Sequence, residues 1–176
     1  EDKNGNNYLF NNNIITNSSN GFDLYGTSIL YQNFTVTDNH IVTNETAIYV
    51  DDIDGIHVFN NNIQSNIGIA VLDSKENHIF ENDISVSKTG IEVSNSEGYI
   101  TDNLIRGNCK TDNCDVVYFT NVGESGIKIL SLSDIKAKRN VVESFNILVN
   151  STNSAISLMA VSYTHLTLPT RCVVGG

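Results

Sequence analysis

Tryptophan is absent from this chain, and proline and methionine occur once each. The chain also lacks any run of 18 apolar residues and any signal peptide, so the sequence predicts no membrane-spanning segment. Basic residues are scarce: 10 Lys and Arg stand against 20 Asp and Glu, which gives a formal net charge of -10. An acidic surface repels a phosphate backbone. The composition therefore excludes nucleic acid as an expected partner.

Asparagine and isoleucine are the abundant residues, with 26 and 20 copies in 176 positions. Asparagine tolerates the left-handed backbone conformation of tight turns, and isoleucine suits the buried face of a strand. The composition thus favours an all-β chain of short strands joined by tight turns.

One asparagine returns in a constant setting, two residues before an Ile or Val. The six positions are Asn12, Asn39, Asn61, Asn82, Asn103 and Asn140. Most of the spacings are 21 or 22 residues, and no helical pattern lies between them. A period of this length is typical of a solenoid in which each repeat is one turn of a coil. We expect about six coils, with one insertion near residues 108–125.

A second phrase follows each asparagine, and in it apolar residues alternate with variable ones, as in GIAV at Gly68 and GIEV at Gly90. That alternation is the period of a half-buried strand. Each coil is predicted to hold three strands, with like residues about 4.8 Å apart on successive coils. Val58, Ile63, Ile69 and Val71 are predicted to stack on Ile79, Ile84, Ile91 and Val93. The recurring asparagines are predicted to form an internal ladder at a turn.

Over residues 6–159 this pattern resembles the right-handed parallel β-helix repeat of pectate-lyase-like proteins and of the periplasmic copper-binding repeat family. The resemblance implies a single-stranded β-solenoid. It also makes carbohydrate a reasonable ligand, and a polysaccharide lyase or epimerase a reasonable activity.

Because coils stack in register, residues at the same alignment position of successive coils form a column on the surface. Functional residues that act together are therefore expected to lie in one column. Four residues before the asparagines stand Tyr8, Thr35, His57, His78, Tyr99 and Lys136. A lyase or epimerase needs a base, an acid and a group that neutralises a carboxylate, and His, Tyr and Lys can fill these roles. His57, His78, Tyr99 and Lys136 are therefore the candidate catalytic residues. Two alternatives stay open: the histidines could hold a metal, or they could be ordinary outward strand residues.

No motif requires a cofactor, and Ca²⁺ is a possible ligand of one acidic turn. Asp51, Asp52 and Asp54 crowd one turn, and calcium takes oxygen ligands of this kind. A solvated acidic turn is the competing interpretation. Cys109 and Cys114 are separated by four residues in the insertion, which allows a local disulfide or two free thiols.

The two ends of the chain differ from the repeats. Residues 161–176 share nothing with them and resemble a translated sequencing adapter, so we expect a β-helix fragment over 1–160 followed by a non-native tail. The repeat pattern is already present at Tyr8, and the sequence does not begin with Met. We therefore expect the chain to be an internal piece of a longer protein.

The function predicted from these observations is a scaffold of an exported or cell-surface protein. It would be extracellular, surface-bound or periplasmic, and would contact a polysaccharide or a glycan of a host or cell surface. The absence of a compact cluster of Asp, Arg and Lys argues against an enzyme in this fragment. The alternatives are a polysaccharide lyase or epimerase, and a periplasmic accessory protein for the maturation of metal enzymes.

Overall fold

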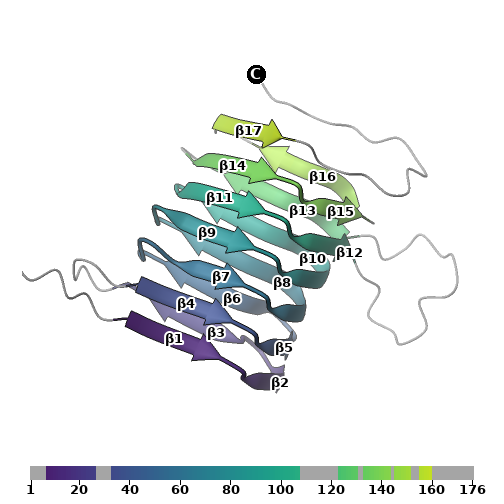
Figure 1. Ribbon diagram of the computed structural model, residues 1–176. Coiled ribbons are helices and arrows are strands. Elements are labelled where there is room, and N and C mark those ends of the chain that lie inside the picture. Colours follow the sequence, from purple (N-terminus) through teal and green to yellow (C-terminus); the bar gives the residue numbers. More distant parts are fainter. Residues whose placement is uncertain are drawn as a thin grey trace, which may run out of the picture.

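The computed structural model describes residues 7–26, 33–107, 123–130, 133–143, 145–151 and 155–159, and all of its regular elements are strands. Every strand pair is parallel. Figure 1 shows the chain winding through successive coils that stack along one axis, with each new coil lying on the previous one. The described residues thus form the predicted all-β parallel solenoid.

Two sheets run the length of this stack. The first, called sheet A, has seven strands in sequence order. They are β1 (Asn7–Asn11), β4 (Asn33–Thr37), β7 (His57–Phe59), β9 (Asn77–Phe80), β11 (Glu97–Thr101), β14 (Asp134–Lys138) and β17 (Ala155–Met159).

Sheet B has ten strands and forms the remaining wall. Two of its strands run without interruption along the whole sheet B part of a coil, whereas the other coils divide the same path into two shorter strands. The long strands are β8 (Asn62–Leu72) and β10 (Asp83–Ser94). The short ones are β2 (Ile14–Ser18), β3 (Phe22–Tyr25), β5 (His40–Thr43), β6 (Thr46–Asp51), β12 (Leu104–Gly107), β13 (Gly123–Leu130), β15 (Val141–Glu143) and β16 (Phe145–Ser151).

The core is made of columns of aliphatic side chains, one from each coil. Val58 pairs with Ile79 and Ile63 with Ile84, as the sequence predicts. Ile69 likewise pairs with Ile91 and Val71 with Val93. Because similar side chains stack on one another in successive coils, β-branched residues can pack in one repeated conformation. Burial of each side chain stabilises the fold by about 1.5–3 kcal/mol. Many of these isoleucines are completely buried.

The recurring asparagines form the predicted ladder at the turn from sheet A to sheet B. Each donates its side-chain amide to Oδ1 of the asparagine on the next coil at 2.9–3.0 Å, and its backbone N–H to the same oxygen at 3.1 Å. The side chain also donates to a backbone carbonyl of the preceding coil. The buried members of the ladder are Asn39, Asn61, Asn82, Asn103 and Asn140.

The first coil corrects the sequence alignment by one residue. Asn13, and not Asn12, donates its backbone and side-chain N–H groups to Oδ1 of Asn39. Asn12 instead adopts the left-handed backbone, with φ of 54°. Both alignments place an asparagine two residues before an isoleucine, because three asparagines and two isoleucines are consecutive here. Strand pairing decides between them, since Ile15 pairs with Ile41.

The residue before each ladder asparagine turns the chain through the left-handed region. Its φ lies between 50° and 57° in the described coils, and most side chains there avoid this conformation. The positions are Asn12, Asp38, Asn60, Glu81, Asp102 and Arg139.

A second internal ladder, which the repeat alignment missed, lies at the turn that leads back to sheet A. The backbone N–H of Ile53 donates to Oγ of Ser74 at 3.1 Å, and that of Ser74 donates to Oγ of Ser96 at 3.0 Å. The backbone N–H of Ser96 donates in turn to Oγ of Ser133 at 3.1 Å. All three serines are almost completely buried. Hydroxyl groups thus satisfy the buried amides of this turn as asparagines do at the other.

Some predictions fall on residues that the structure does not describe. The pair Cys109 and Cys114 lies outside the described residues, as does the proposed tail at 161–176. Within the described residues, no helix is long and apolar enough to cross a membrane.

Candidate functional site

The four candidate residues lie in one column on the outward face of sheet A. His57 on β7 pairs with His78 on β9, which pairs with Tyr99 on β11, which pairs with Lys136 on β14. The residue that follows each of them in its strand points into the core, and these four residues, Val58, Ile79, Ile100 and Ala137, are buried. Alternation along a strand therefore directs the column away from the core.

The one-residue shift in the first coil changes the end of this column. Leu9, and not Tyr8, pairs with Thr35, which pairs with His57. Tyr8 pairs with Phe34 and stacks on its ring at 4.7 Å between centroids. The register column in the described coils therefore reads Leu9, Thr35, His57, His78, Tyr99, Lys136 and Ser157.

The side chains of this column contact one another in series. The ring centroids of His57 and His78 are 5.0 Å apart, and those of His78 and Tyr99 are also 5.0 Å apart. Nζ of Lys136 lies 5.4 Å from the centroid of the Tyr99 ring, within the range of a cation–π contact. Because each ring covers part of the next, solvent meets mainly ring edges and polar atoms.

A second column runs beside the first, two residues further along each strand. Phe59 pairs with Phe80, and their rings stack at 4.7 Å with an angle of 9° between their planes. Phe80 pairs with Thr101, which pairs with Lys138. The sequence search did not select Phe59 and Phe80, although their position two residues after the two histidines was a usable signal.

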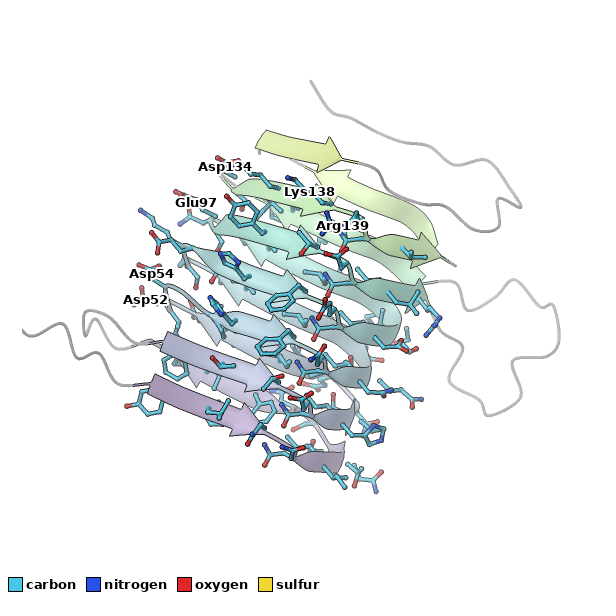
Figure 2. The ribbon with its side chains drawn as sticks, in the orientation of Figure 1. Asp52, Asp54, Glu97, Asp134, Lys138 and Arg139 are labelled. Atoms are coloured by element: carbon cyan, nitrogen blue, oxygen red, sulfur yellow. The ribbon has the colours of Figure 1, made fainter. Side chains whose placement is uncertain are left out.

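Charge is segregated around these columns. In the described coils neither column contains a carboxylate, and on β14 they carry Lys136 and Lys138. Figure 2 shows acidic side chains of Asp52, Asp54, Glu97 and Asp134 along one edge of sheet A. At the opposite turn Arg139 makes a two-pronged ion pair with Asp102, at 2.5 and 2.6 Å. The two columns thus form a part of the outward face without acid groups, and Glu97 and Asp134 border it on the same face.

The stacked imidazoles influence one another electrostatically. Partial desolvation lowers the pKa of His57 below its usual 6.5, and the positive charge of protonated His78 lowers it further. Neutral imidazole is the form that accepts hydrogen bonds and binds metal ions. At neutral pH His57 is therefore held in that form.

The acidic turn considered for calcium is occupied by hydrogen bonds within the protein. Oδ1 of Asp54 accepts the backbone N–H of Lys75 at 2.7 Å, and Oδ2 of Asp51 accepts the hydroxyl of Tyr49 at 3.4 Å. Asp52 takes the left-handed turn conformation, with φ of 57°. In the part of the chain that the structure describes, no three His, Cys, Asp or Glu side chains are grouped to hold a metal ion.

Comparison with known families is decisive for the fold. A family model for the right-handed β-helix region matches residues 2–142. The chain belongs to the right-handed β-helix family. This confirms the right-handed β-helix fold predicted from the repeats, including the hand of the coil. No curated protein and no solved structure matches this β-helix in the corresponding comparisons.

Membership in the β-helix family establishes the architecture of the chain but not its function, because one solenoid fold serves many functions. The four candidate residues are together, as the sequence predicts, but they lie along a line. A row of side chains with one member per coil suits contact with an extended molecule that lies parallel to the axis. It does not focus three groups on one reacting bond.

Proposed function

We propose that this β-helix is a scaffold that binds an extended carbohydrate chain along the outward face of sheet A, outside the cytoplasm. The observation that carries the proposal is the column of His57, His78, Tyr99 and Lys136, with ring centroids 5.0 Å apart. This column presents one polar group from each coil to solvent at a constant spacing.

The spacing favours a polymer with a short repeat. Strands of a sheet recur every 4.7–4.9 Å, and one sugar of an extended glycan has a similar length. A glycan aligned with the axis can therefore meet an imidazole, a phenol and an ammonium group on successive sugars. The neighbouring edges of Phe59 and Phe80 add apolar area, against which the C–H groups of a sugar ring can pack.

The charge of the face supports the same ligand class. An acidic protein repels anionic polymers, but the two outward columns contain no carboxylate in the described coils and include Lys136 and Lys138. Acidic glycans are thus not excluded by the net charge of -10. Neutral and acidic glycans both belong in the test.

The test is affinity electrophoresis of the whole chain through gels that contain neutral or acidic polysaccharides, followed by calorimetry with any that retard it. The double variant Phe59→Ala/Phe80→Ala and the single variant Tyr99→Ala are expected to weaken the retardation. Tyr25→Ala is the matched control, because Tyr25 is an exposed tyrosine on sheet B. Equal weakening by Tyr25→Ala, or no retardation by any polysaccharide, would refute the proposal.

The enzymatic alternative uses the same column and is distinguished by a separate assay. A lyase that cleaves uronate chains produces unsaturated ends that absorb ultraviolet light. Binding without such absorbance, across a panel of uronate polymers with calcium present, supports a scaffold. Fractionation of source cells tests the location: recovery of the full-length product in the cytoplasm alone contradicts an exported scaffold.

A further inference from the structure

We propose that His57 and His78 form a surface site for a divalent transition-metal ion, and that Cu²⁺ is the ion it binds most tightly. The two residues are register partners on adjacent parallel strands, so their Cα–Cβ bonds point the same way from neighbouring coils. Their ring centroids are 5.0 Å apart. This inference does not depend on carbohydrate binding.

The geometry of the rings suits chelation by two imidazoles. Their planes are tilted by 41°, so one edge of each ring is closer to its neighbour than the centroids are. Two nitrogens that bind one metal ion at about 2.0 Å and at a right angle lie roughly 3 Å apart. A modest side-chain rotation of His57 can close the remaining gap.

The neighbours of the pair allow that rotation. On the preceding strand the partner of His57 is Thr35, which carries no ring, and His57 is exposed. His78 is half-buried and is held by its contact with Tyr99 at 5.0 Å. One ligand is thus fixed, whereas the other is free to approach it. Water can fill the remaining coordination positions on the solvent side.

The chemistry of the donors selects the ion. Imidazole nitrogens suit Cu²⁺, Ni²⁺ and Zn²⁺, and among divalent ions of the first transition row Cu²⁺ forms the most stable complexes. Two ligands do not make a closed structural site, so we expect an open site from which chelators readily remove the ion. Metal binding requires neutral imidazole, so we expect the affinity to fall at acidic pH.

The test is calorimetric titration of the untagged whole chain with CuCl₂, with glycine as a competing ligand. His57→Ala and His78→Ala are each expected to weaken Cu²⁺ binding at least about tenfold, because each removes one of the two imidazole ligands. His40→Ala is the matched control. His40 is also exposed, but its partners on the adjacent strands are Ile14 and Asn62 and not histidine.

A second measurement uses the unsubstituted protein and so does not depend on how the variants fold. Small additions of Cu²⁺ should broaden the imidazole NMR signals of His57 and His78 before that of His40. Unchanged affinity in the double variant His57→Ala/His78→Ala would overturn the proposal and assign the ion to other ligands of the chain, such as the amino terminus, carboxylates or cysteine thiols. Simultaneous broadening of all three histidines would overturn it as well.

Discussion

Asn61 donates its side-chain amide to Oδ1 of Asn82 at 2.9 Å, and its backbone N–H donates to the same oxygen at 3.1 Å. Asn82 in turn donates to the backbone carbonyls of Val58 and Phe80 and to Oδ1 of Asn103. One side chain thus links three coils in a site where water does not reach, since Asn82 is only 2% exposed.

Replacement of Asn82 by Ala should therefore strongly destabilise the folded protein. It leaves the backbone N–H of Asn61 buried without its acceptor and removes the bonds that Asn82 makes to Val58, Phe80 and Asn103; an unsatisfied buried group costs about 1–3 kcal/mol, and each lost hydrogen bond adds about 1 kcal/mol. We expect a loss of about 3 kcal/mol or more in the free energy of unfolding, measured by urea denaturation. Asn62→Ala, at an exposed position, should change it by less than about 0.5 kcal/mol. Similar losses in both variants would contradict the ladder.

The turn residue before the ladder gives a test of backbone conformation. Asn60 has φ of 55°, where a β-branched side chain is strongly disfavoured. Asn60→Val is expected to lower the free energy of unfolding by about 1–2 kcal/mol. Asn62→Val is the matched control, since Asn62 starts strand β8 and valine favours strands. The prediction fails if the two valine variants are equally stable in thermal denaturation.

Gly90 tests how closely the coils approach one another. A Cβ atom at this position would lie 2.5 Å from the backbone oxygen of Gly126 and would overlap Cγ2 of Ile105. Because backbone atoms cannot move aside cheaply, Gly90→Ala should destabilise the protein by about 1–3 kcal/mol. Ser85→Ala, at a half-buried position of the same strand, should have a much smaller effect on the denaturation midpoint. A neutral Gly90→Ala would show that the coils can separate locally.

The stacked histidines make a prediction about pH. The pKa of His57 is lowered in the folded protein, chiefly by desolvation and then by His78. The unfolded chain therefore takes up a proton first as pH falls below 6.5, so stability should decrease from that point until the folded-state pKa is reached. NMR titration should place the His57 midpoint below 6.5, and His78→Gln should raise it part of the way. His57→Gln should remove this contribution from the pH dependence of unfolding.

How much of this could be predicted from the sequence depends on the regularity of each coil. The ladder from Asn39 to Asn140 and the column of His57 and His78 followed from a constant distance to one repeated residue. The first rung was misplaced because three consecutive asparagines satisfy the same pattern, and only the pairing of Ile15 with Ile41 chooses Asn13.

The serine ladder was missed for a related reason. Ser74 lies eight residues before its ladder asparagine, whereas Ser96 and Ser133 lie seven before theirs. An alignment fixed on the asparagines therefore places Ser74 in a different column from Ser96 and Ser133. In the preceding coil the corresponding residue is Ile53, which contributes only its backbone N–H to this ladder. Short local differences in turn length thus conceal a ladder that the three-dimensional stacking makes continuous.

The stacking of parallel coils also determines how the protein would respond to force. Backbone and asparagine hydrogen bonds join one coil to the next, so they run along the long axis of the stack. Tension applied between its ends would load these bonds in line, one coil at a time, and not all together in shear. The molecule should then unfold one coil at a time, through a series of small rupture events at similar forces. Its isoleucine columns would be exposed one layer after another.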